Sequence, residues 1–231
     1  MKKVLAHYFE SLIKLVVEKI SFEMDNDSEL DWALERLHFH INEPRSAKFQ
    51  EYYFHILSNR DFFLNSEEFF TAFKYNYSLQ GINKSYLSSL ENAKPRILNL
   101  IDERKLSQLY LEYFARANIK HGNKEVERNL ASFFTKLVRT FLPADYCALD
   151  NPIKNYFGLK NEGFFIAFLV VSELYKRWLT NNSRKIEYIK RELKLTDGNN
   201  LLVRDELTNL KILDLIFWAE ANPFGRNQPL N

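Results

Sequence analysis

The sequence FFIAFLVV occupies residues 164–171 and contains no polar side chain. It lies within a longer helix-forming stretch, residues 162–180, in which apolar residues face every side for two turns. A helix that is apolar all round is buried in the middle of a fold. The run is too short to cross a bilayer, which takes about 20 residues. We therefore expect a central helix here, and no membrane span.

The low glycine content favours helices for the rest of the chain as well. There are 6 glycines in 231 residues, against an average usage of roughly 7%. Tight hairpins, β-sandwiches and dinucleotide-binding domains need many more glycines, whereas helices need few. The 20 Phe and 12 Tyr side chains supply core volume for helix packing. We predict an all-α protein with about ten helices in one compact body.

Apolar periodicity indicates how these helices are distributed along the chain. It predicts helices over residues 2–22, 106–119, 124–141, 183–195 and 205–221, among others. Residues 80–93, QGINKSYLSSLENA, contain turn formers with weak periodicity and are the expected linker. We therefore predict an N-terminal helical half, residues 1–93, and a C-terminal helical half, residues 94–231. The alternative is that both halves form a single domain.

Cysteine usage and the N-terminal residues indicate the compartment. Cys147 is the only cysteine, so no internal disulfide framework exists, and a reducing compartment is expected. The N-terminus lacks the apolar region and cleavage site of a signal peptide. We expect a cytoplasmic protein in which Cys147 is a small buried residue.

The sequence contains no pattern specific for a cofactor or a metal. A Walker loop, a glycine-rich dinucleotide fingerprint and a His-Glu-x-x-His motif are all missing. His38 and His40 are two residues apart and fall on different faces of a helix, which is a poor arrangement for metal binding. We expect no cofactor and no metal site.

Charge is distributed unevenly, although 32 Lys and Arg nearly balance 30 Asp and Glu. Residues 176–194 carry seven basic and two acidic side chains, and residues 94–139 carry ten basic and five acidic ones. A basic face with interleaved aromatic rings is typical of nucleic-acid binding, and Tyr175, Trp178 and Tyr188 are candidate stacking residues. Solvated helix faces are also rich in Lys and Arg, which is the alternative interpretation. The candidate nucleic-acid-binding residues are Lys176, Arg177, Arg184, Lys185, Lys190, Arg191 and Lys194.

A second candidate is the segment FLPADYCALDNPIKNYFGLK, residues 141–160, in which Asp150 precedes a short helix. It resembles the segment around the catalytic aspartate of helix-hairpin-helix DNA glycosylases, and also a segment of uncharacterised helical bacterial proteins related to them. The resemblance implies that Asp150 is a carboxylate that stabilises a sugar cation or activates water. It covers about 20 residues of the chain.

The sequence also departs from that family. Residues 124–142 contain no glycine, so the DNA-anchoring hairpin is missing, together with its nucleophilic lysine. With one cysteine, no four-cysteine iron–sulfur site can form. The alternative role for Asp150 is a helix N-cap ahead of Pro152.

A third candidate is the sequence Arg116-Ala117-Asn118-Ile119-Lys120-His121, expected at the end of a helix. It is similar to the catalytic motif of the HEPN superfamily, many members of which are metal-independent ribonucleases of defence and toxin systems. That resemblance implies that Arg116 and His121 act on the phosphate and the 2′-hydroxyl. One such spacing is expected by chance in a chain of this composition. The alternative is a surface arginine and a helix C-terminal histidine.

The sequence favours a bacterial protein that binds nucleic acid, DNA or RNA, through a degenerate glycosylase-like C-terminal half, with binding favoured over catalysis. The first alternative is a helical scaffold that binds a protein partner or forms a homodimer and has no catalytic activity. The second is the HEPN-like ribonuclease.

Overall fold

The computed structural model describes residues 2–20, 27–79, 81–121 and 124–222. These residues form an all-α fold of thirteen α-helices, one π-helical turn and one short β-hairpin. Their order along the N-terminal half is α1 (Lys2–Ile20), α2 (Asp27–Asn42), α3 (Pro44–Ile56), α4 (Arg60–Asn65), α5 (Phe69–Asn76) and α6 (Lys84–Asn92). They continue with α7 (Lys94–Asp102), α8 (Leu106–Leu109), the π-turn η1 (Tyr110–Phe114), β1 (Ala117–His121), β2 (Lys124–Arg128), α9 (Ala131–Phe141), α10 (Asn151–Tyr156), α11 (Phe164–Asn181), α12 (Ser183–Thr196) and α13 (Asn209–Ala221).

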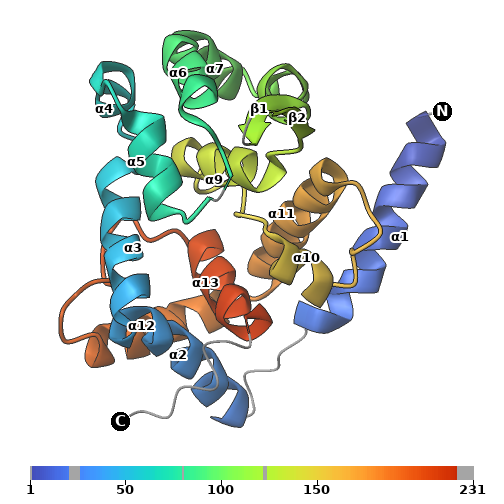
Figure 1. Cartoon of the computed structure of the whole chain (residues 1–231). Helices are drawn as coiled ribbons and strands as arrows, with labels where there is room; N and C mark the ends of the chain where they lie inside the picture. The colour runs from blue at the N-terminus through green and yellow to red at the C-terminus, as the bar shows by residue number, and fades with distance from the viewer. Residues whose placement is uncertain (1, 21–26, 80, 122–123, 223–231) are drawn as a thin grey trace.

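Helices α11 and α13 occupy the middle of the molecule. The apolar run at residues 164–171 begins α11, which packs against α1, α9, α12 and α13. Figure 1 shows α13 between α3 on one side and α10 and α11 on the other. Nearly every residue of α13 from Leu210 to Phe217 is buried, because the helix is covered from several directions. The two helices together form the centre around which the others pack.

Aromatic rings fill much of the core, in agreement with their frequency in the sequence. Phe63, on α4, contacts Phe69 and Phe141 edge-to-face, with ring centroids 4.7 and 4.9 Å apart. Edge-to-face pairs of this kind add about 0.5–1.5 kcal/mol each beyond the burial of their area. These contacts join α4 and α5 to α9, across the expected boundary at residue 93.

The expected linker and boundary lie in a region of continuous helix packing. Residues 84–92 of the expected linker form helix α6, whose N-cap Asn83 accepts a hydrogen bond from the Tyr86 backbone. The linker interpretation was therefore wrong for these residues. Ala93 ends α6 and also begins α7. Helices of the two halves pack together, since α2 contacts α12 and α13, and α4 contacts α7.

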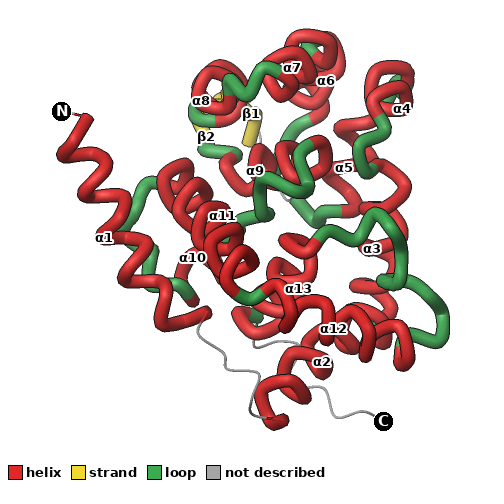
Figure 2. Tube along the Cα trace, turned by 180° about the vertical axis from the view of Figure 1, so that it is seen from behind, coloured by secondary structure: helices red, strands yellow, loops and turns green. Residues whose placement is uncertain are grey.

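The helix prediction was wrong for residues 117–119 and 124–128, which form an antiparallel hairpin (Figure 2). The β-branched residues Ile119 and Val126 are cross-strand partners, which favours strand pairing. The two strands are joined by Gly122-Asn123, which lies outside the described residues but is a dipeptide typical of two-residue hairpins. The helices expected at 106–119 and 124–141 are consequently shortened to α8 with η1 and to α9.

Candidate nucleic-acid interface and other candidate sites

The basic residues of α11 are held in ion pairs. Arg177 donates to both carboxylate oxygens of Glu10 on α1, at 2.8 Å each, and to Glu173, one turn before it on α11, at 2.8 Å. These hydrogen bonds raise the pKa of Arg177 further above its ordinary value. Lys176 lies 3.3 Å from Glu173 and above the ring of Tyr146. Both cations thus have carboxylate partners, and Arg177 joins α1 to α11.

The basic residues of α12 are arranged differently. Ile186, Ile189 and Leu193 form its buried face. The opposite side carries Arg184, Tyr188, Arg191 and Leu195 at spacings of four, three and four residues, and we call these four residues the α12 ridge. Such spacings place side chains in one row along a helix. The α12 ridge is therefore an outward-facing row of alternating cationic and apolar side chains.

The contacts of the α12 cations show which of them are available to a ligand. The Arg191 guanidinium lies 4.5 Å from the centroid of the Tyr188 ring and 3.3 Å from Glu192. Lys190 lies 3.6 Å from Glu187, and Lys185 is half-buried. Arg184, in the first turn of α12, and Lys194, in its last turn, are exposed, and neither has a carboxylate within ion-pair distance among the described residues. These two cations are the least engaged of the predicted set.

Of the three candidate stacking residues, Tyr188 alone is exposed. Its side chain is 36% accessible, whereas Tyr175 is fully buried with its ring stacked on Phe217. Trp178 is half-buried and packs against the core. The exposed aromatic surface on this part of the chain is therefore confined to the α12 ridge.

The cations of residues 94–139 are largely paired or buried. Arg96, Arg104, Lys105 and Arg116 lie within 4 Å of Glu112, Asp145, Glu103 and Glu127, respectively. Lys94 and Arg139 are buried. Within this segment, the hairpin lies toward the end of the molecule opposite α12, as Figures 1 and 2 show.

Asp150 is a helix N-cap. One carboxylate oxygen accepts from the Ile153 backbone N–H at 3.1 Å, and the other accepts from the indole N–H of Trp218 at 3.1 Å. The interpretation of Asp150 as an N-cap is therefore confirmed: one oxygen caps the first turn of α10, and the other binds the Trp218 side chain of α13. The glycosylase-like role stays a prediction.

The Arg116–His121 sequence belongs to the hairpin, so its expected place at the end of a helix was wrong. Arg116 is exposed just before β1, and its guanidinium lies 3.4 Å from Glu127. His121 ends β1, where its backbone is paired with Lys124. Burial in this stretch alternates every two residues, from buried Ala117 to exposed Asn118 to buried Ile119, and this period is that of a strand. A ribonuclease role for these residues stays a prediction.

The other titratable candidates are held in structural contacts. His40 is buried between α2, α3 and α13, where Nε2 donates to the Leu215 carbonyl at 2.9 Å and Nδ1 lies 2.7 Å from the Ser46 hydroxyl. Burial lowers the pKa of His40 to about 3, so the ring is neutral. Cys147 is buried as expected, and burial raises the pKa of its thiol to about 12.

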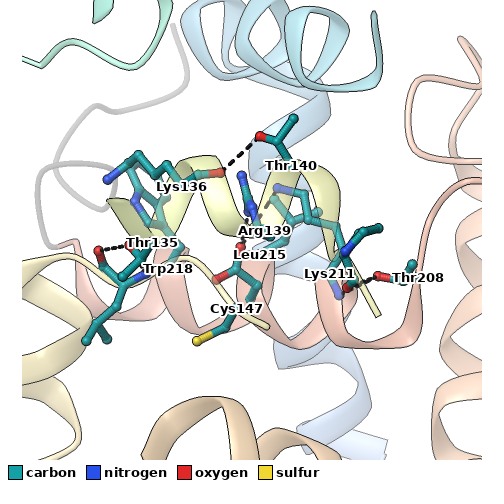
Figure 3. Close-up of polar contacts among 12 residues, drawn as sticks. Thr135, Lys136, Arg139, Thr140, Cys147, Thr208, Lys211, Leu215 and Trp218 are labelled. Atoms are coloured by element: carbon teal, nitrogen blue, oxygen red, sulfur yellow. Dashed lines mark hydrogen bonds and ion pairs between the residues drawn. The ribbon is translucent and has the colours of Figure 1, made fainter. Parts of the chain in front are cut away.

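Sequence reasoning missed a buried ionic cluster between α3, α9 and α13, formed by Tyr53, Arg139, Lys211 and Asp214. Figure 3 shows the part of it contributed by α9 and α13. Arg139 forms an ion pair with Asp214, and the Lys211 ammonium lies 3.9 Å from the same carboxylate. Both basic groups lie over the Tyr53 ring, at 4.6 Å for Arg139 and 4.5 Å for Lys211. The signal in the sequence was the pair Lys211 and Asp214 inside the apolar stretch NLKILDLIFWAEA.

The ionic cluster is closed to solvent, and it holds two basic groups against one carboxylate. Arg139, Lys211 and Asp214 are each at most 3% exposed. Burial lowers the pKa of Lys211 well below its ordinary value, and Arg139 lowers it further, while Asp214 opposes both effects. A neutral Lys211 amine leaves one cation and one anion in the interior, which is the least costly arrangement. The arrangement joins three helices and offers no solvent-facing group for a reaction.

A shallow groove of about 410 Å³ lies between α4 and α7. It is lined by Leu64, Pro95, Leu98, Asn99 and Asp102, and the Asp102 carboxylate is paired with Arg60 at 2.6 Å. The groove has an apolar floor and one neutralised acidic edge.

The chain matches no protein-family model, no curated protein and no solved structure. Among the described residues, no three or more His, Cys, Asp or Glu side chains are placed to hold a metal ion. No helix within residues 2–20, 27–79, 81–121 and 124–222 is long and apolar enough to cross a membrane.

Proposed function

We propose that the protein binds nucleic acid through the α12 ridge together with Lys194. The observation that carries this proposal is the outward row of Arg184, Tyr188 and Arg191, in which the Arg191 guanidinium lies 4.5 Å from an exposed aromatic ring. Arginines of this kind bind phosphates, and release of counterions from the phosphate backbone supplies the affinity. Binding of this kind needs neither Asp150 nor His121.

The proposal assigns binding to fewer of the basic residues than the sequence predicted. Lys176 is paired with Glu173 on the same helix, and Arg177 is paired with Glu10, which joins α1 to α11. Surface ion pairs are worth little individually and exchange readily, yet a cation that already has a carboxylate partner gains less from a phosphate. The expected order of importance therefore places Arg184 and Lys194 ahead of Arg191, which is paired with Glu192, and ahead of the α11 cations.

The test is fluorescence anisotropy of the full chain with labelled oligonucleotides over a KCl titration. The logarithm of the binding constant should fall linearly with the logarithm of salt concentration. The triple variant Arg184→Gln, Arg191→Gln, Lys194→Gln should reduce that slope by about 0.7 to 0.9 for each phosphate that the variant no longer neutralises.

A charge-matched control separates this site from a general effect of net charge. Arg60, Arg104 and Lys105 are 42%, 51% and 55% exposed and are paired with carboxylates away from α12. The triple variant Arg60→Gln, Arg104→Gln, Lys105→Gln removes the same number of positive charges. Equal loss of affinity in both triple variants, or no salt-dependent binding by the wild type, would overturn the proposal.

A further inference from the structure

The α12 ridge offers two kinds of surface in alternation. Arg184 and Arg191 are cationic, while Tyr188 and Leu195 are apolar. Arg184 and Leu195 are eleven residues apart, so at a rise of 1.5 Å per residue they are separated by about 16.5 Å along the helix. A ligand that covers the ridge therefore meets charge and apolar surface in turn over this length.

The two apolar members are both exposed, Leu195 more than Tyr188. Leu195 is 74% accessible and Tyr188 is 36% accessible. The Arg191 guanidinium lies over the Tyr188 ring. A ligand that offers phosphates alone would leave these side chains in water, because a phosphate gains nothing from apolar surface.

A strand with unpaired bases provides both partners that the ridge requires. Its phosphates carry the negative charge, and each of its bases has a flat face that stacks on aromatic and apolar side chains. In a duplex the base faces are stacked on one another, and only base edges are accessible from the grooves. The alternation along the ridge therefore matches an unpaired strand better than a duplex.

We infer that the α12 ridge binds single-stranded nucleic acid, with base faces on Tyr188 and Leu195 and phosphates on Arg184 and Arg191. This inference rests on the proposed function and names its substrate class. Arg191 then has two roles, since its guanidinium lies over the Tyr188 ring while the N–H groups that do not donate to Glu192 bind a phosphate.

The experiment compares three labelled probes of equal length on the full chain: a single-stranded oligonucleotide, the same backbone with abasic sites, and a blunt duplex. The abasic probe keeps the phosphates and lacks the bases. Stacking on one side chain contributes about 5- to 150-fold in affinity per base. The single-stranded probe should therefore bind tighter than the abasic probe by a factor in this range, and tighter than the duplex.

Two variants assign the contacts. Tyr188→Ser should reduce the affinity for the single-stranded probe toward that for the abasic probe, with the salt slope unchanged. Tyr188→Phe should retain the discrimination, because it keeps the ring. The control is Tyr75→Ser, which removes an 80% exposed tyrosine from α5 and should leave all three affinities unchanged.

The outcomes distinguish the inference from the proposed function. Salt-dependent binding of all three probes with equal affinity, or an unchanged preference in Tyr188→Ser, would overturn the assignment of single strands and leave the phosphate-binding surface in place. Absence of salt-dependent binding to every probe would remove the proposed function itself. Circular dichroism of each variant confirms that the exposed substitutions leave the fold intact.

Discussion

Asp214 is one buried carboxylate between two buried basic side chains, Arg139 and Lys211. The cost of removing charges from water makes such clusters poor sources of stability, yet removing one partner leaves an uncompensated charge. The members of the cluster should therefore differ sharply in their response to substitution. Lys211 is dispensable if its amine is neutral, whereas Asp214 is required by the permanently charged Arg139.

We expect Asp214→Asn to lower the free energy of unfolding by about 3–5 kcal/mol, because the Arg139 guanidinium then stays buried without an anion. Lys211→Met should cost much less, since it replaces a buried amine over the Tyr53 ring with an apolar chain of similar length. Urea denaturation of both variants measures the difference. Equal losses would show that Lys211 is charged in the folded protein.

Asp150→Asn should affect stability and leave nucleic-acid affinity unchanged. Asparagine is as good an N-cap as aspartate, so the bond from the Ile153 N–H survives. A side-chain NH₂ facing the Trp218 indole N–H would instead place two donors together, at a cost of about 1–3 kcal/mol. Thermal denaturation and the anisotropy assay check the two parts. Loss of an activity at unchanged stability would favour the glycosylase-like role.

At the scale of elements, local apolar pattern predicts long helices well and misses elements whose pattern is ambiguous. The expected helix 162–180 agrees with α11 (Phe164–Asn181), because its apolar residues fit no strand of ordinary length. The first strand of the hairpin was missed because Ile119 continues the helical spacing of Phe114 and Ala115. The choice between the two depends on Gly122-Asn123, which helices and hairpins both use as an end signal.

The basic residues of the candidate site could be predicted from the sequence, but which of them already have carboxylate partners could not. Seven basic residues in 176–194 are evident from the sequence, whereas the partner of Arg177 is Glu10, far away in sequence. No local pattern reveals such a contact, which depends on how α1 packs across α11. The same reasoning applies to Arg139 and Asp214, whose pairing depends on the packing of α9 against α13.

The hairpin can be tested by the alternation of burial along β1. Ile119 is 1% exposed, whereas its neighbour Asn118 is exposed. Ile119→Ala should lower the free energy of unfolding by about 2–5 kcal/mol, because apolar burial is reduced and a cavity is left. Asn118→Ala should change it by about 0.5 kcal/mol or less. Chemical denaturation gives both values, and comparable losses at the two positions would contradict the strand.

At the scale of the whole molecule, the contacts of α13 join helices from both parts of the chain. Its Lys211 meets α3, its Asp214 meets α9, and its Leu215 carbonyl accepts from His40 of α2. A proton added at this junction perturbs several helices together. The pH dependence of global stability therefore reports on the junction.

We expect His40 to make the fold weaker in acid. The unfolded chain binds a proton at His40 with the ordinary pKa of 6.5, whereas the folded chain holds that pKa near 3, so acid favours unfolding. The contribution of neutral His40 to the free energy of unfolding is fully present above pH 6.5 and is lost as the pH falls from 6.5 toward 3. One proton of difference corresponds to about 1.4 kcal/mol per pH unit.

His40→Gln keeps a side-chain donor for the Leu215 carbonyl and removes the titrating ring, so the stability difference between pH 6 and pH 5 should shrink by about that amount. Chemical denaturation at the two pH values measures it, and an identical pH dependence in the variant would mean that His40 is protonated within the fold.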